Sequence, residues 1–181
     1  MRRCMLVLGL WCSLSLAVAA PAVAERPLTT LTFDELSAQP VQGLSVNGVT
    51  FGFTIAGVAS ADAVYAGAGP GTTTWIQDPS LEGSAFGTLT LTFDQPTTVL
   101  EFGVARVCIC TLPEGAAVEL FRPGAERSFA TLTTATSPLI SFSEALFSYR
   151  GPAIQRAVIT FPSPELADRF SLDNLRFQGK A

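Results

Sequence analysis

The chain has 181 residues, with 11 Lys and Arg against 15 Asp and Glu, no His and a formal net charge of −4. This length predicts one domain with a core of ordinary size. The acidic balance argues against nucleic acid or an anionic membrane as partner, because both need basic patches. The lack of His removes the usual general base and the Ser-His-Asp relay.

The N-terminal segment has the three-part pattern of a secretory signal peptide. A basic start precedes an apolar run, and residues 22–24 read Ala-Val-Ala, the small-residue pattern of a cleavage site. The apolar run is near the lower limit for spanning a membrane, which favours cleavage over anchoring. We predict a signal peptide over residues 1–24 and one domain over residues 25–181, secreted or periplasmic, with no membrane attachment after cleavage.

Apolar and polar residues alternate along most of the remaining chain. Residues 88–93 read TLTLTF, which places Leu89, Leu91 and Phe93 on one face of a half-buried strand. The turn signal Gln-Pro at 95–96 separates this strand from residues 99–104, so the two predict a hairpin. Further short strands are expected at 31–33, 49–53, 118–121, 128–132, 140–142, 147–149, 157–161 and 170–177. Such a pattern predicts an all-β, antiparallel β-sandwich of jelly-roll type with nine to ten short strands.

Residues 65–75 form a Gly-rich segment that ends on the one Trp of the predicted mature chain. Its glycines predict a loop. Sugar-binding sites commonly present an aromatic platform beside polar groups, and we therefore predict Tyr65, Trp75, Gln77 and Asp78 as ligand-binding residues. The alternative is that Trp75 packs into the edge of the core below its loop.

Cys108 and Cys110 are the two cysteines that signal cleavage leaves in the chain. Their spacing puts both thiols on the same side of an extended strand, and an oxidising compartment favours pairing. We predict a local structural disulfide in a very small loop, which should be relatively reducible. A redox element and a bridge to another chain are alternatives. Zinc is weakly supported, because a structural zinc site needs four ligands.

The two ends of the predicted domain carry its most recognisable segments. Residues 30–36 read TLTFDEL and residues 169–177 read RFSLDNLRF. With residues 48–53 and 89–102, they resemble a family of bacterial exported jelly-roll domains that is common among proteins with a PEP-CTERM sorting tail. The terminal pairing is also similar to MAM-type and carbohydrate-binding-module β-sandwiches. The chain ends without a Pro-Glu-Pro motif, so sorting by that route is not implied.

The same resemblance implies a structural calcium ion between the first and last strands. Its ligands would be Asp34 and Glu35 at one end of the chain, with Asp173 and Asn174 at the other. Calcium takes six to eight oxygen ligands, mostly carboxylates and carbonyls. The alternative is that these residues are solvated turn formers that act independently.

By analogy of fold, the resemblance implies a non-catalytic module that recognises an extracellular polysaccharide or envelope glycan. Two alternatives stay open. One is a matrix or surface structural protein that acts through protein contacts. The other is a carboxylate-based glycoside-active enzyme, which needs two carboxyl groups about 5 to 10 Å apart. We predict no catalytic residue, although carboxylates are available at Asp62, Asp78, Glu82, Glu101 and Glu119. The oligomeric state is left open.

Overall fold

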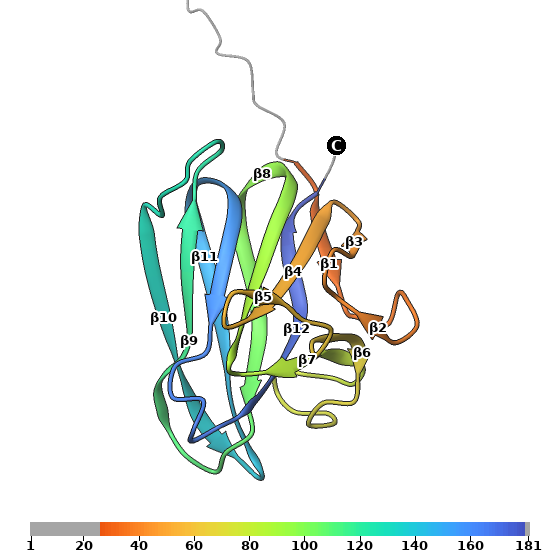
Figure 1. The fold of residues 1–181 in the computed structure, drawn as a ribbon, viewed down its shortest axis with the longest axis vertical. Coiled ribbons are helices and arrows are strands. Elements are labelled where there is room, and N and C mark those ends of the chain that lie inside the picture. The colour runs from red at the N-terminus through yellow and green to blue at the C-terminus, as the bar shows by residue number, and fades with distance from the viewer. Residues whose placement is uncertain (1–25, 180–181) are drawn as a thin grey trace, which may run out of the picture.

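Antiparallel strands, twelve in number, and no helix make up residues 26–179, the part of the chain that the computed structural model describes (Figure 1). The predicted all-β sandwich is confirmed, but the strands are more numerous than expected and two of them are long. No helix of membrane-spanning length and hydropathy occurs among these residues. The signal peptide predicted over residues 1–24 lies outside the described part and stays a prediction.

The strands follow one another in the chain with short connections. They are β1 (Leu28–Leu31), β2 (Gln39–Pro40), β3 (Ser45–Val46), β4 (Val49–Ile55), β5 (Val58–Ala59), β6 (Val64–Gly67), β7 (Ser80–Ser84), β8 (Gly87–Arg106), β9 (Leu112–Phe121), β10 (Ala130–Leu139), β11 (Phe142–Thr160) and β12 (Arg169–Gln178).

The long strands β8 and β11 fold the hydrogen-bonded network into two layers. They pair antiparallel along their whole length, and their register shifts between Arg150 and Arg156. Both bend over the top of the molecule in Figure 1 and pass from one layer to the other. The first layer holds β3, β4, β5 and β9 with the early half of β8 and the late half of β11. The second layer holds β1, β2, β6, β7 and β12 with the other halves.

The predicted hairpin between residues 88–93 and 99–104 is wrong. Both segments belong to β8, in which the first pairs with β4 and the second with β12. Pro96 lies between these two ladders, where the bend leaves no strand partner that needs its missing N–H. The Gln-Pro signal therefore marks a change of layer within one strand.

Aromatic side chains from both layers meet in the core. The Phe53 ring of β4 lies 6.1 Å from the Phe170 ring of β12, measured between centroids. The Phe93 ring of β8 lies 5.2 Å from the Phe177 ring of β12. All four side chains are buried. Contacts of this kind join the layers and contribute beyond the area they bury.

A bulge in β12 decides which of its side chains face outward. Asn174 has a φ of 54°, and the register of β12 on β8 shifts between Asp173 and Arg176. The extra residue lets Leu172 and Leu175 both face the core, where they are buried. Asp173 and Arg176 therefore both lie on the outer face of the second layer.

Candidate functional site

The outer face of the second layer carries polar side chains where its three longest segments lie side by side. Alternation along β8 turns Glu101 and Gly103 outward, and alternation along β11 does the same for Glu144 and Leu146. β12 adds Arg176, whose Nη1 lies 2.8 Å from Glu101 Oε1. This face is the floor of the site described below.

A strap, residues 69–78, lies against this floor and is held there by two carboxylates. Glu144 accepts hydrogen bonds from the Thr73 hydroxyl at 2.6 Å and from the backbone N–H groups of Thr74 at 3.2 Å and Trp75 at 3.1 Å. Asp173 accepts one from the Gln77 N–H at 2.8 Å. Both carboxylates are almost fully buried. The backbone of the strap is therefore fixed on either side of the Trp75 side chain.

Hydrogen bonds also set the charge state of Glu144. Its burial would raise the pKa, but the donors in the strap, at Thr73, Thr74 and Trp75, outweigh that effect and lower the pKa. Glu144 is consequently an anion at neutral pH and a strong acceptor for the strap.

Gly103 allows the close approach between the strap and the floor. A Cβ atom at this position would clash with the backbone carbonyl of Trp75. Asp78 orders the other end of the strap, because its carboxylate accepts hydrogen bonds from Gly69 N–H at 2.8 Å and Gly71 N–H at 3.1 Å. The strap thus has an ordered backbone although its sequence is rich in glycine.

A cleft of about 240 Å³ opens between the strap and the floor. Trp75 is 39% exposed and forms one wall. The other lining residues are Thr74, Glu101, Gly103, Leu146, Asn174 and Arg176. An aromatic face, a carboxylate, a guanidinium and an amide are thereby offered to one ligand. Among the described residues that line the cleft, Glu101 is the single carboxylate, so the cleft lacks the pair that a glycosidase needs.

The four predicted ligand-binding residues fall in different places. Trp75 lines the cleft, whereas Gln77 and Asp78 are exposed and hold the strap in shape. Tyr65 is buried with its ring centroid 5.0 Å from that of Phe33, and its hydroxyl donates to a Glu35 carboxylate oxygen. Tyr65 therefore belongs to the core and offers no platform to a ligand.

Sequence reasoning missed two of the charged cleft residues, Glu101 and Arg176, as ligand-binding residues. Both are outward positions on strands, and each by itself looks like an ordinary solvated charge. The signal that connects them is the pairing of β8 with β12, in which Arg176 lies opposite Glu101. Their juxtaposition becomes visible only when the register of that ladder is known.

The predicted calcium ligands are engaged with protein donors. The Asp34 carboxylate accepts from the Thr32 hydroxyl at 2.6 Å, and the Glu35 carboxylate accepts from the Thr32 N–H at 2.8 Å. Asp173 accepts from the N–H of Asn174 at 2.6 Å as well as from the strap. The expected pairing of the chain ends is present, as β1 pairs with β12. No three His, Cys, Asp or Glu side chains of residues 26–179 form a group that suits a metal ion. Calcium at these four residues stays a prediction.

Asp173 carries a pH dependence with a definite sign. Burial raises its pKa to about 6, against the opposing hydrogen bonds from Gln77 and Asn174, and the charges of Asp34 and Glu35 raise it further. Between pH 4 and 6 the folded protein keeps this proton while the unfolded chain has released it. The free energy of unfolding therefore falls as the pH rises through this window, by on the order of 2–3 kcal/mol in all.

Asp173→Asn is expected to remove that loss. The free energy of unfolding of the variant, minus that of the wild type, should increase from pH 4 to pH 7 and then level off. Urea denaturation at each pH measures this difference, with the exposed Asp94→Asn as control. A difference that stays constant across the window would show that the Asp173 carboxyl does not titrate there.

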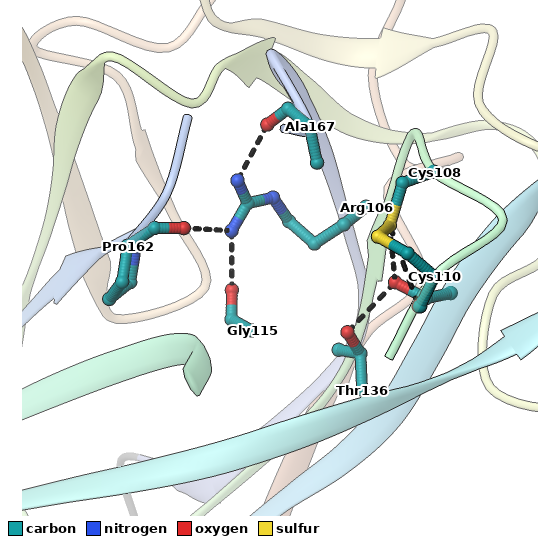
Figure 2. The surroundings of a disulfide bond; sticks show 8 residues. Arg106, Cys108, Cys110, Gly115, Thr136, Pro162 and Ala167 are labelled. Atoms are coloured by element: carbon teal, nitrogen blue, oxygen red, sulfur yellow. Dashed lines mark hydrogen bonds between the residues drawn. A yellow bond between two sulfur atoms is a disulfide. The ribbon is translucent and has the colours of Figure 1, made fainter. Parts of the chain in front are cut away.

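The Cys108–Cys110 disulfide is confirmed (Figure 2). The Cα atoms are 5.3 Å apart, and Cys108 Sγ lies 3.4 Å from the Ser143 hydroxyl. Nearby, the buried Arg106 donates to the backbone carbonyls of Gly115 at 2.7 Å and Ala167 at 2.6 Å, and to that of Pro162 at 3.2 Å (Figure 2). The bridge closes a small loop beside a structural cation that ties three connections together.

No protein-family model and no curated protein matches this sequence. Among solved structures, the chain is similar to family 29 carbohydrate-binding modules. One variant module has 10% sequence identity and a TM-score of 0.44, over 84% of this chain and 91% of that chain. A variant complexed with cellulohexaose has 12% identity and a TM-score of 0.43, with coverage of 84% and 91%. A third, complexed with mannohexaose, has 12% identity and a TM-score of 0.42, with coverage of 84% and 92%. The likeness is distant, and the proposals below depend on the geometry of the cleft.

Proposed function

We propose that this domain is a non-catalytic binding module that recognises an extracellular polysaccharide or envelope glycan in the cleft beside Trp75. One observation carries the proposal. A partly exposed Trp side chain, on a backbone fixed by Glu144, opens onto a cleft that also holds the Glu101–Arg176 pair and Asn174.

The chemistry of the cleft suits a sugar ring. The C–H face of a sugar packs against an aromatic ring, while its hydroxyl groups need both donors and acceptors at the edge. Trp75 supplies the aromatic face, Glu101 supplies acceptors, and Arg176 and Asn174 supply donors. The cleft volume of about 240 Å³ lies below the roughly 300–1,000 Å³ of typical small-molecule pockets. It therefore suits one portion of a longer chain that lies across the surface.

Preorganisation supports a binding role over a purely structural one. The hydrogen bonds from Thr74 N–H and Trp75 N–H to Glu144 order the strap before any ligand arrives. A ligand then does not have to pay for ordering that segment, which leaves more of the contact energy for affinity. A Trp placed only to fill the core would not need a fixed wall above an open cleft.

Protein contact is the second candidate function, and it has its own observation. Ile109 in the disulfide loop is 75% exposed, and Ile140 between β10 and β11 is 85% exposed. Large aliphatic side chains at such positions are suited to a partner surface. This function would leave the cleft without a glycan.

Binding of the exported protein to a broad panel of neutral, acidic and amino polysaccharides tests the proposal. The panel is run once with calcium and once with chelator, so that metal dependence is separated from recognition. We expect at least one class of glycan to bind in a way that free oligosaccharide of the same class competes away. Absence of binding to the whole panel by a folded sample would reject the glycan module and favour protein contact. N-terminal sequencing of the exported protein checks the proposed cleavage after residue 24.

A further inference from the structure

Three side-chain oxygens converge on the base of the strap, at Gly69. The point that a Cβ atom would occupy on this glycine lies 2.5 Å from Ser80 Oγ, 2.8 Å from Asp78 Oδ1 and 3.2 Å from Ser171 Oγ. The oxygens come from the strap, from β7 and from β12. Glycine leaves open a small cradle that any other residue would fill.

Ser80 provides an independent sign that something belongs in this cradle. Its side chain is fully buried, and its hydroxyl has no hydrogen-bond partner in the protein. Buried hydroxyls are nearly always partnered, because an unpartnered one forfeits the hydrogen bonds it made to water. A bound species in the cradle would supply the missing partner.

A second carboxylate adjoins the same group. The Ser171 hydroxyl donates to Glu82 Oε1 at 3.2 Å, so Glu82 lies directly behind the cradle. Burial raises the pKa of Glu82 against the hydrogen bond from Ser171 and the charge of Arg169, and the nearby Asp78 charge raises it further. Two carboxylates and two hydroxyls, with no nitrogen or sulfur ligand, form a donor set for a hard cation.

We propose that Asp78, Ser80, Glu82 and Ser171 bind a calcium ion at the Gly69 cradle. Calcium accepts irregular sets of oxygen ligands and keeps water in its shell, which suits two carboxylates and two hydroxyls. The ion would join the strap to β7 and β12. This place is distinct from Asp34 and Glu35, where the pairing of the chain ends suggested calcium.

Calcium titration of the full exported chain after treatment with chelator tests the site. The probe is calcium chloride, and the readouts are calorimetric heat and the melting temperature. At a calcium concentration about a hundred times the dissociation constant, we expect a rise in the melting temperature of about 5 °C or more. Neither heat nor a shift up to about 10 mM calcium, which is beyond the usual range of extracellular calcium modules, would overturn the proposal and assign the cradle to water.

Two variants locate the ion. Glu82→Gln removes one carboxylate charge, and the calcium shift should be lost. Ser80→Ala removes the unpartnered hydroxyl, so its metal-free melting temperature should match or exceed that of the wild type, while its calcium affinity should fall roughly tenfold. Glu119→Gln, on the exposed side of β9, is the matched charge control and should keep the full shift.

The rival position is tested in the same series. Glu35→Gln should leave the calcium shift intact, and a shift that disappears in Glu35→Gln but persists in Glu82→Gln would overturn the Gly69 site. The melting readout needs no glycan, so failure of the cation site and failure of glycan recognition are separate results. A protein that binds calcium and no glycan would retain this inference and reject the proposed function.

Discussion

Trp75→Ala is expected to weaken glycan binding by about 30-fold or more, which is the effect of losing a central aromatic anchor. The side chain forms one wall of the cleft, and its removal takes away the surface on which a sugar ring would pack. The strap should keep its fold, because Glu144 holds the backbone N–H groups of Thr74 and Trp75 and not the indole. Calorimetric titration with the glycan found in the panel measures the change.

Phe86→Ala is the matched control for the loss of Trp75. Phe86 is 57% exposed in the turn between β7 and β8 and does not line the cleft. This variant should bind as the wild type does. Equal affinity of Trp75→Ala and wild type, with both folded by circular dichroism, would place recognition elsewhere on the surface.

Gly103→Ala is expected to disturb both stability and binding. The added Cβ would meet the backbone carbonyl of Trp75, which cannot rotate away as the tip of a long side chain can. The strap must then lift from the floor and weaken its bonds to Glu144 and Asp173. We expect a loss of about 1–3 kcal/mol in the free energy of unfolding, the usual cost of overpacking. Urea denaturation measures the loss, and glycan titration should show weaker binding.

Gly52→Ala is the control for the change at Gly103. Gly52 also lies within a strand, β4, but a Cβ there would stand 3.5 Å from Thr90 Cβ, an ordinary contact. Its effect on binding should be absent. If Gly103→Ala binds and unfolds like the wild type, the strap is not held against β8 in the way described here.

Alternation along strands was readable because it depends on near neighbours in the chain. Leu89 and Leu91 are buried, as the TLTLTF pattern predicts. The same local reasoning failed at Pro96, because a turn between two strands and a bend within one strand carry the same Gln-Pro signal. Only the partners of each half, β4 and β12, distinguish the two.

The candidate site was predictable in part, and its limits have a physical cause. Trp75 was identified because the mature chain is predicted to hold one Trp, after a flexible segment. Tyr65 was misplaced because its apolar ring and its hydroxyl suit a platform and a core equally, and the distant Glu35 decides between them. Glu144 gave no signal at all, since its role depends on a strap some 70 residues away in the chain.

The arched strands β8 and β11 also determine how this sandwich can breathe. At the bend, the two layers are one continuous piece of backbone ladder, so they cannot slide apart there without breaking it. At the other end of β8 the layers are fastened by Arg106, whose guanidinium spans three carbonyls and faces the Phe161 ring at 5.6 Å. The molecule is thus a clasp, with a hinge at one end and a catch at the other, and thermal opening begins at the catch, beside the disulfide.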